Sequence, residues 1–167
     1  RNGADALVLT SAVNRRYATG FQSSAGVCYL SEKQAVYLTD FRYVEAARQQ
    51  ITGFDVREIK ISESYTEAVN ALAAQDGVKK IALEDETLTC AEYRRWEHGL
   101  QAQAVPLGHA VADLRASKTD EEVQQIAAAQ RIAEQAFSEI LNEIRAGVTE
   151  KELAARLTYL MLHYGAE

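Results

Sequence analysis

Cysteine, histidine and surplus basic charge are all scarce in this chain. Its 167 residues include two cysteines and three histidines, and 18 Lys and Arg stand against 24 Asp and Glu. A duplex-binding protein needs a concentrated cationic face that releases counterions from phosphate, so we expect no nucleic-acid partner. Cys28 lies in an apolar run and Cys90 in a predicted first helical turn, without CxxC spacing, which favours two free thiols over a disulfide.

Long apolar runs are also missing. None approaches the roughly 20 residues that a bilayer span requires, and the first residues lack the basic-then-apolar pattern of a signal segment. We therefore expect no membrane partner and a cytoplasmic location. Because the chain begins at Arg1 and not at methionine, we expect it to be trimmed, and an upstream signal stays an open alternative. With 47% apolar and 25% charged residues, the composition is that of a globular protein.

The order of elements predicts an α/β domain with a mixed β-sheet flanked by helices. Apolar, β-rich runs predict strands, and apolar residues spaced three and four apart predict helices. Strands are expected over 6–9, 25–30, 35–39, 56–61 and 81–83 and around Val105, and helices over 42–51, from Ser64 and from Thr89. Residues 31–34 predict a hairpin loop, and the later alternation of helix and strand favours parallel neighbours.

Four helix starts share the capping-box pattern, in which a Ser or Thr side chain and a Glu three residues later satisfy free backbone N–H groups. The four pairs are Ser64/Glu67, Thr89/Glu92, Thr119/Glu122 and Thr149/Glu152. After the last strand, an apolar stripe from Val123 to Ile144 predicts a helix of about seven turns, and a second amphipathic helix follows. Two such helices need a further covering surface, which we expect from a sheet formed by residues beyond Glu167.

Two segments concentrate amides, guanidinium groups and aromatic rings between predicted strands. They are NRRYATGF, from Asn14 to Phe21, and TDFRY, from Thr39 to Tyr43. Such crowding at strand ends is typical of a surface that faces a ligand or a neighbouring domain. The candidates for lining a substrate cleft are Phe21, Arg42, Tyr17, Asn14 and Asp40.

Each charged candidate also has a structural interpretation. A guanidinium binds a carboxylate in bidentate geometry, which would suit Arg42 to a substrate carboxylate. The alternatives are that Arg42 pairs with Asp40 or caps a strand end, and that Arg15 and Arg16 are solvated. Asp40 ends a strand just before a helix, so it could equally cap that helix.

The aromatic and acidic candidates have alternatives as well. Phe21 and Tyr17 could form an apolar wall of a cleft, or they could anchor their loop in the core. We interpret Glu-Asp-Glu at 84–86 as a solvated loop, although a metal site could be imagined there. The histidines at 98, 109 and 163 have no second ligand three or four residues away, so we interpret them as solvated or packing residues.

The same segments resemble the Xaa-Pro dipeptidase and aminopeptidase P family, relatives of creatinase. The resemblance rests on 14–21 and 39–43, on the boundary segment LRASKTDEEVQQI from Leu114 to Ile126, and on the last part of the chain from Gly147 to Glu167. It covers nearly the whole chain, and the order and spacing of the motifs make it specific.

The resemblance implies a two-part protein. Residues 1–111 would form the creatinase/prolidase-like N-terminal domain, with an RNase-H-like arrangement, and residues 112–167 would supply a linker and the first two helices of a "pita-bread" catalytic domain. In the family, that domain holds two divalent cations (Mn, Co or Zn) with two Asp, one His and two Glu. Asp113, His109 and His163 do not match those positions, so this chain receives no catalytic residue and no metal ligand.

The resemblance further implies that the full-length protein, a homodimer that depends on two divalent cations such as manganese, cleaves Xaa-Pro bonds in short proline-containing peptides. Such a bond lacks an N–H, and a metal pair can deliver hydroxide while polarising the carbonyl. This chain would frame the substrate cleft and mediate oligomerisation, and alone it is predicted to be inactive and to bind no metal tightly. Two alternatives are open: a creatinase-like amidinohydrolase that needs no metal, and a catalytically inactive pita-bread protein that binds partners.

Overall fold

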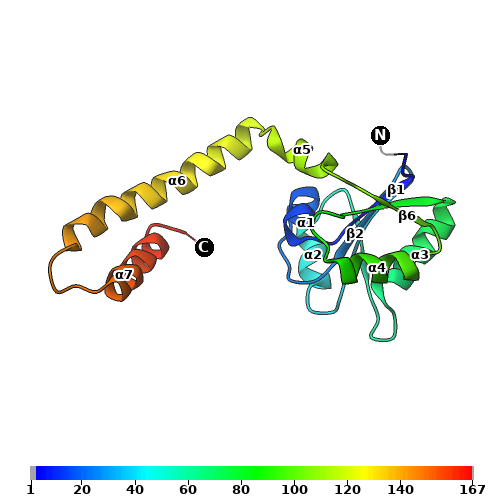
Figure 1. Cartoon of the computed structure of the whole chain (residues 1–167), viewed down its shortest axis with the longest axis horizontal. Coiled ribbons are helices and arrows are strands. Elements are labelled where there is room, and N and C mark those ends of the chain that lie inside the picture. Colours follow the sequence, from blue (N-terminus) through cyan, green and yellow to red (C-terminus); the bar gives the residue numbers. More distant parts are fainter. Residues whose placement is uncertain (1–2, 167) are drawn as a thin grey trace. The chain divides into compact units, whose positions relative to one another are not determined.

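The computed structural model describes residues 3–166, and the chain divides into two compact units. The first unit ends at Arg115 and contains a sheet flanked by helices, and the second begins at Ala116 and contains helices alone (Figure 1).

A six-stranded sheet forms the centre of the first unit, in the order β4-β3-β2-β1-β5-β6. The strands are β1 (Ala6–Leu9), β2 (Val27–Ser31), β3 (Ala35–Thr39), β4 (Asp55–Glu58), β5 (Lys80–Leu83) and β6 (Gln103–Pro106). β2 is antiparallel to both of its neighbours, whereas the pairs β1–β5, β3–β4 and β5–β6 are parallel. The predicted mixed sheet and its hairpin are confirmed, and five of the six strands run in one direction.

Alternation along the strands sorts the side chains onto two buried faces. Val8 and Tyr29 lie on the face covered by α3 and α4, whereas Leu9 and Cys28 lie on the face covered by α1, α2 and α5 (Figure 1). The helices are α1 (Ala12–Thr19), α2 (Val44–Gln50), α3 (Tyr65–Asp76), α4 (Cys90–Gly99) and α5 (Ala110–Ala116). Strands covered on both faces need continuous apolar runs, which explains why β1 carries no polar residue.

All four predicted capping boxes are present. They open α3, α4, α6 (Asp120–Ile140) and α7 (Glu150–His163). At α7, for example, the Thr149 hydroxyl accepts from the Glu152 N–H at 3.2 Å, and the Glu152 carboxylate accepts from the Thr149 N–H at 2.8 Å. Each N-cap contributes about 1 kcal/mol, so these pairs fix where the helices begin.

Helix α1 is absent from the sequence-based prediction, as is α5, and both omissions are wrong. The Ser11 hydroxyl caps α1 by accepting from the Asn14 N–H at 3.2 Å. The helix ends at Gly20, whose φ of 70° lies in the left-handed region that glycine adopts without a steric cost. Strand β4 also ends earlier than predicted, because Ile59 turns into the core while Ile61 is fully exposed.

The second unit contains α6, the short 3₁₀ turn η1 (Leu141–Glu143) and α7. Helices α6 and α7 pack through Ala136, Ile140 and Leu160, and α6 ends at Ile140 rather than continuing to Ile144 as predicted. Several large apolar side chains stay exposed here: Val123, Ile126, Phe137, Ile144 and Leu162. Across the described residues no helix combines the length and the apolar character that crossing a membrane would require.

Candidate functional site at the carboxyl edge of the sheet

The carboxyl edge of the sheet brings together residues from three strands. Because β1, β3 and β5 run in the same direction, the residues that follow them, Thr10, Asp40 and Glu84, lie at one edge. The chain leaves β1 for α1 on one face and leaves β5 for α4 on the other (Figure 1). In open α/β sheets such a switch between neighbouring parallel strands opens a crevice in which ligands bind.

Glu84 enters this crevice from the end of β5, and its side chain is only 3% exposed. Its Oε1 accepts from the Asn14 side-chain amide at 2.7 Å and the Ser11 hydroxyl at 2.8 Å. Its Oε2 accepts from the Ser11 N–H at 2.8 Å, the Thr10 hydroxyl at 2.9 Å and the Thr10 N–H. The carboxylate therefore occupies the N-terminus of α1, where free N–H groups favour an anion.

The ionisation of Glu84 follows from these contacts. Burial acts to raise the pKa of Glu84, but the hydrogen bonds from Ser11, Thr10 and Asn14 together outweigh burial and hold the pKa below its ordinary value of 4.5. The carboxylate is charged at neutral pH and its acceptors are used within the chain. The prediction of a solvated loop is therefore wrong for Glu84. The sequence feature that indicates a buried Glu84 is its position directly after a buried strand, next to the polar residues that follow the neighbouring parallel strand.

Asn14 and Tyr17, two of the cleft candidates, connect α1 to α5. The Asn14 side-chain oxygen accepts from Arg115 Nη1 at 3.1 Å, and the Tyr17 hydroxyl donates to the Leu114 carbonyl at 3.3 Å. Asn14 is buried, whereas Tyr17 is 42% exposed. Of the two side chains, only Tyr17 offers substantial free surface to a ligand.

Asp40 and Arg42 form an ion pair at the end of β3. The Arg42 guanidinium meets both Asp40 carboxylate oxygens, at 3.1 Å and 2.7 Å, and its side chain is 54% exposed. These hydrogen bonds lower the pKa of Asp40. Helix α2 begins after Tyr43, whose side chain makes no capping hydrogen bond, but the Asp40 carboxylate also accepts from the Arg42 N–H at 3.0 Å in the turn that leads into the helix, as the capping alternative predicts. The guanidinium keeps exposed surface and also lies 5.4 Å from the Tyr43 ring centre.

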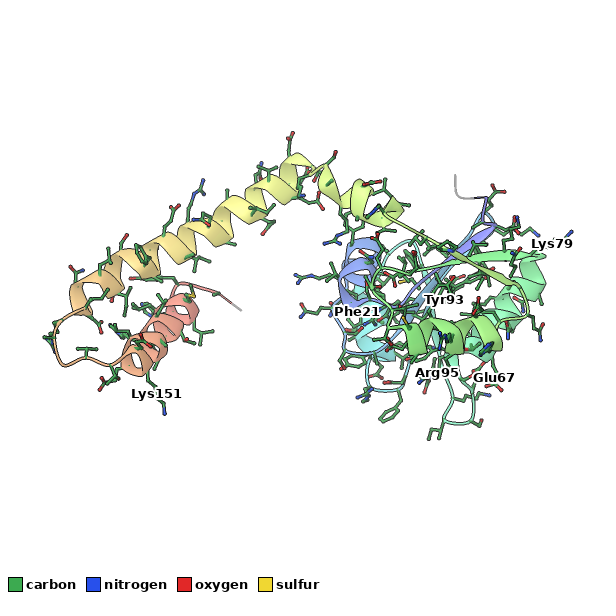
Figure 2. All side chains as sticks on the ribbon, viewed as in Figure 1. Phe21, Glu67, Lys79, Tyr93, Arg95 and Lys151 are labelled. Carbon is green, nitrogen blue, oxygen red and sulfur yellow. The ribbon has the colours of Figure 1, made fainter. Side chains whose placement is uncertain are left out.

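Phe21 lies in the core beside α1 (Figure 2). It is 5% exposed and meets the Tyr37 ring edge-to-face, with ring centres 6.0 Å apart. In this structure it anchors the turn that follows α1, and a role beside substrate stays a prediction.

Arg16 is exposed, as the interpretation of a solvated arginine predicts. Arg15 is buried, so the same interpretation is wrong for Arg15. Its Nη1 donates to the Ser23 hydroxyl at 3.1 Å and the Tyr37 hydroxyl at 3.5 Å, and its Nη2 donates to the Ser23 carbonyl at 3.2 Å. Gly26 makes room for this group, because a Cβ there would stand 2.8 Å from Nη1 and 2.5 Å from the Tyr37 hydroxyl. Nothing in the amino-acid pattern around NRRY distinguishes the buried arginine from its exposed neighbour.

Metal-binding side chains do not gather within residues 3–166. No group of three or more His, Cys, Asp or Glu among them could hold an ion. His109 pairs with Glu86 at 2.9 Å, and His163 stacks on Tyr159 with ring centres 5.9 Å apart. These donor sets do not fit a metal centre, so no chemical step is assigned to a metal held by the described residues.

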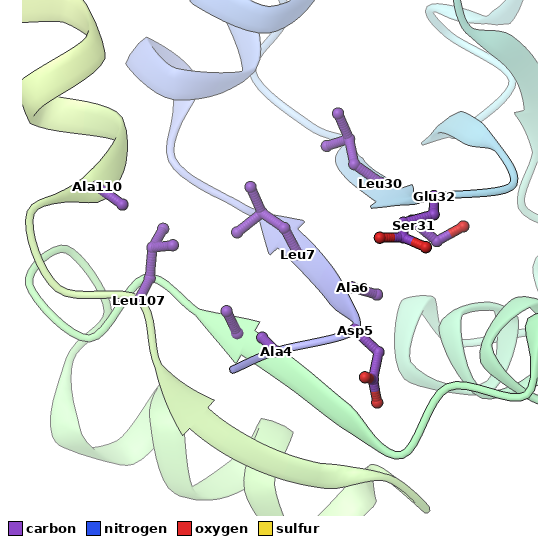
Figure 3. A pocket seen from close by; sticks show the side chains of 10 residues that line it. Ala4, Asp5, Ala6, Leu7, Leu30, Ser31, Glu32, Leu107 and Ala110 are labelled. Atoms are coloured by element: carbon purple, nitrogen blue, oxygen red, sulfur yellow. The ribbon is translucent and has the colours of Figure 1, made fainter. Parts of the chain in front are cut away.

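A cavity of about 330 Å³ lies on the α5 side of the sheet (Figure 3). Leu7, Leu30 and Leu107 stand around it. The Asp5 carboxylate at its rim already accepts from the N–H groups of Lys79 and Lys80, both at 2.9 Å. With aliphatic walls and a carboxylate that is already engaged, this cavity offers no converging catalytic groups.

Known proteins with this arrangement cover the chain almost completely. Residues 1–117 match the creatinase/prolidase N-terminal domain, and residues 124–167 match metallopeptidase family M24. An Xaa-Pro dipeptidase from Bacillus anthracis is 35% identical over 99% of this chain and 46% of its own, with a TM-score of 0.92. An X-Pro aminopeptidase from Thermotoga maritima is 32% identical over 99% of this chain and 48% of its own, with a TM-score of 0.89.

A curated relative, an uncharacterized peptidase of Bacillus subtilis, is 33% identical over 99% of this chain and 46% of its own length. The chain thus spans about half the length of the relatives it matches. Because the match to the N-terminal domain covers residues 1–117, which is most of this chain, the chain belongs to the creatinase/prolidase N-terminal domain family.

Proposed function

We propose that this chain is the N-terminal portion of a metal-dependent peptidase that cleaves Xaa-Pro bonds. The observation that carries the proposal is the 35% identity, over 99% of the chain, to an Xaa-Pro dipeptidase. Residues 1–111 act as the N-terminal domain, and residues 112–167 begin the catalytic domain. A homodimer and a cytoplasmic location belong to the same proposal.

The carboxyl edge of the sheet supplies the part of this chain that frames the substrate. Arg42 supports that role, since its guanidinium is half exposed and Asp40 holds it in a fixed orientation. A peptide ending in proline presents a carboxylate, and a guanidinium binds this group with two parallel hydrogen bonds. Tyr17 adds exposed aromatic surface, while Phe21 and Asn14 support the framing turn from the core.

The divalent cations of the proposal bind outside the described residues, whose donor groups do not cluster. The task of this chain is therefore to bind and orient substrate. Orientation lowers the activation barrier, because a substrate that is already held in its reactive geometry has lost the translational and rotational entropy that would otherwise be lost on reaching the transition state.

Hydrolysis by the longer protein that contains this sequence tests the proposal. With manganese, cobalt or zinc we expect release of proline from Leu-Pro and Ala-Pro but not cleavage of Leu-Ala, and loss of activity after chelation. Failure to cleave any Xaa-Pro peptide with all three cations, or hydrolysis of creatine instead, would contradict it.

A variant of the same protein tests the framing residues. We expect Arg42→Ala to raise KM for Leu-Pro about tenfold with little change in kcat, because it removes one charged hydrogen-bonding group that binds the ground state and the transition state alike. Arg16→Ala, an exposed arginine on α1, is the matched control and should leave KM unchanged. Equal KM values for the two variants would mean that Arg42 does not bind the substrate.

A further inference from the structure

Arg15 is a buried cation without a carboxylate partner among residues 3–166. It is 3% exposed, none of the ion pairs among the described residues includes it, and its Nε has no hydrogen-bond partner there. Its partners are the neutral groups of Ser23 and Tyr37. A charge taken out of water is unfavourable unless it is paired, so such an arginine needs an anion.

Within residues 3–166, the carboxyl edge of the sheet does not supply that anion. Glu84, the other buried charge at this edge, is fully engaged by Thr10, Ser11 and Asn14. Arg15 instead lines a cavity of about 280 Å³ beside these residues. The buried guanidinium and the cavity are therefore two independent observations at one place.

The walls of this cavity combine cations with aromatic rings. Its lining includes Arg15, Ser24 and the segment 25–27 together with Tyr65, Glu92, Arg95 and Trp96. Arg95 projects from α4 and is exposed (Figure 2). Glu92 is occupied as the capping carboxylate of Thr89. Two guanidinium groups against one carboxylate leave a net positive charge beside the rings of Tyr65 and Trp96.

Cations next to aromatic and aliphatic walls favour a particular ligand chemistry. A guanidinium binds a carboxylate with paired hydrogen bonds, and an apolar body gains from burial beside aromatic rings. Ligand pockets in proteins occupy roughly 300–1,000 Å³, so this cavity of about 280 Å³, just below that range, accepts only a small molecule. We propose that this cavity binds a small organic carboxylate with an aromatic or aliphatic body, held between Arg15 and Arg95 and packed against Trp96.

The proposal does not depend on peptidase activity, and the chain carries its own reporter. Trp96 lines the cavity and is the single tryptophan of the 167 residues, so its fluorescence reports occupancy directly. The 167-residue chain is titrated with benzoate, with the neutral isostere benzamide and with inorganic phosphate. We expect a saturable change with benzoate, none with benzamide and a much weaker response to phosphate.

Three variants locate the site. Arg95→Gln should weaken benzoate binding about tenfold, because it removes one charged hydrogen-bonding group. Arg94→Gln, the exposed neighbour on α4 that does not line the cavity, should leave it unchanged. Arg15→Met should abolish binding in a chain whose circular dichroism stays native, and if that variant does not fold, the comparison of Arg95 with Arg94 decides.

Three results would overturn the proposal. No saturable fluorescence change with benzoate would mean that the cavity binds no such ligand. Equal affinity for benzoate and benzamide would mean that the guanidinium groups do not contribute to binding. Equal affinity for benzoate and phosphate would mean that the apolar walls do not contribute. Identical binding by Arg95→Gln and Arg94→Gln would place any observed binding elsewhere on the molecule.

Discussion

Replacing Glu84 by glutamine tests whether the carboxyl edge of the sheet is held together as described. The substitution keeps the shape of the side chain and removes its charge. Glutamine retains one acceptor oxygen, while its NH₂ group faces donors that the carboxylate oxygen had satisfied. Half-buried N–H and O–H groups of Thr10 and Ser11 then lose their acceptor.

The size of the effect follows from these contacts. Hydrogen bonds to a charged group contribute roughly 1.5–3 kcal/mol each, but five that share one carboxylate do not add. Removing one member of a buried charged network costs roughly 3–5 kcal/mol, and an anion at a helix N-terminus contributes up to about 2 kcal/mol. Since glutamine keeps part of the network, we expect Glu84→Gln to lower the free energy of unfolding by about 3 kcal/mol.

The pH dependence gives a second readout. The folded-state pKa of Glu84 is lower than its ordinary value of 4.5, so its stabilisation is complete above that value and is lost as the pH falls through the folded-state pKa. The variant has no carboxylate at this position. The difference in stability between the two proteins should therefore be constant near neutral pH and should shrink on acidification below pH 4.5.

Urea unfolding monitored by the fluorescence of Trp96 measures both effects, because this single tryptophan lies in the first unit. At a slope of about 1–3 kcal/mol per molar urea, the expected loss shifts the midpoint by at least about 1 M. Glu86→Gln is the matched control, since that carboxylate is 42% exposed and pairs with an exposed histidine. A change below about 0.5 kcal/mol for Glu84→Gln, or an unaltered pH profile, would mean that the Glu84 carboxylate does not hold this edge together.

Three further predictions follow from the packing. Burial raises the pKa of Cys28 to about 12, so a thiol reagent at about pH 8 should modify only the exposed Cys90, and two modified thiols in the native mass spectrum would contradict this. Asp76→Ala removes the acceptor for the Tyr29 and Ser31 hydroxyls, at 2.9 and 2.6 Å, and should cost about 2 kcal/mol by urea unfolding; no change would mean that these bonds are not stabilising. Thr149→Ala should lower the stability of α7 by about 1 kcal/mol, measured by unfolding followed through the helical circular dichroism signal. A variant as stable as the parent would show that this cap is dispensable.

The elements that the sequence predicts well are those with a local cause. The capping boxes depend on two residues three positions apart, and the strands on short apolar runs, so both can be read without knowing the fold. Helix α1 combines the strong helix formers Ala and Arg with Val, Asn, Tyr and Thr, which have lower helix propensity, and its end depends on a left-handed glycine. The residues over 12–19 therefore indicate a helix less clearly than they indicate a polar segment that faces a ligand.

The candidate site depends on contacts between distant residues, and the sequence predicts it only in part. The pairing of Asp40 with Arg42 is local and was an open alternative. The bonds of Glu84 to Ser11 and Asn14 join residues that lie 73 and 70 positions apart. Whether an arginine is buried, as Arg15 is, depends on the space left by Gly26, which no residue spacing encodes.

We propose that this chain frames a substrate while the reactive centre of the peptidase lies in the part of the longer protein outside these 167 residues. Hydrolysis of Ala-Pro in manganese by the purified 167-residue chain, side by side with the longer protein, tests that division most directly. We expect turnover by the longer protein and none by the 167 residues alone. Release of proline by the 167-residue chain would contradict it.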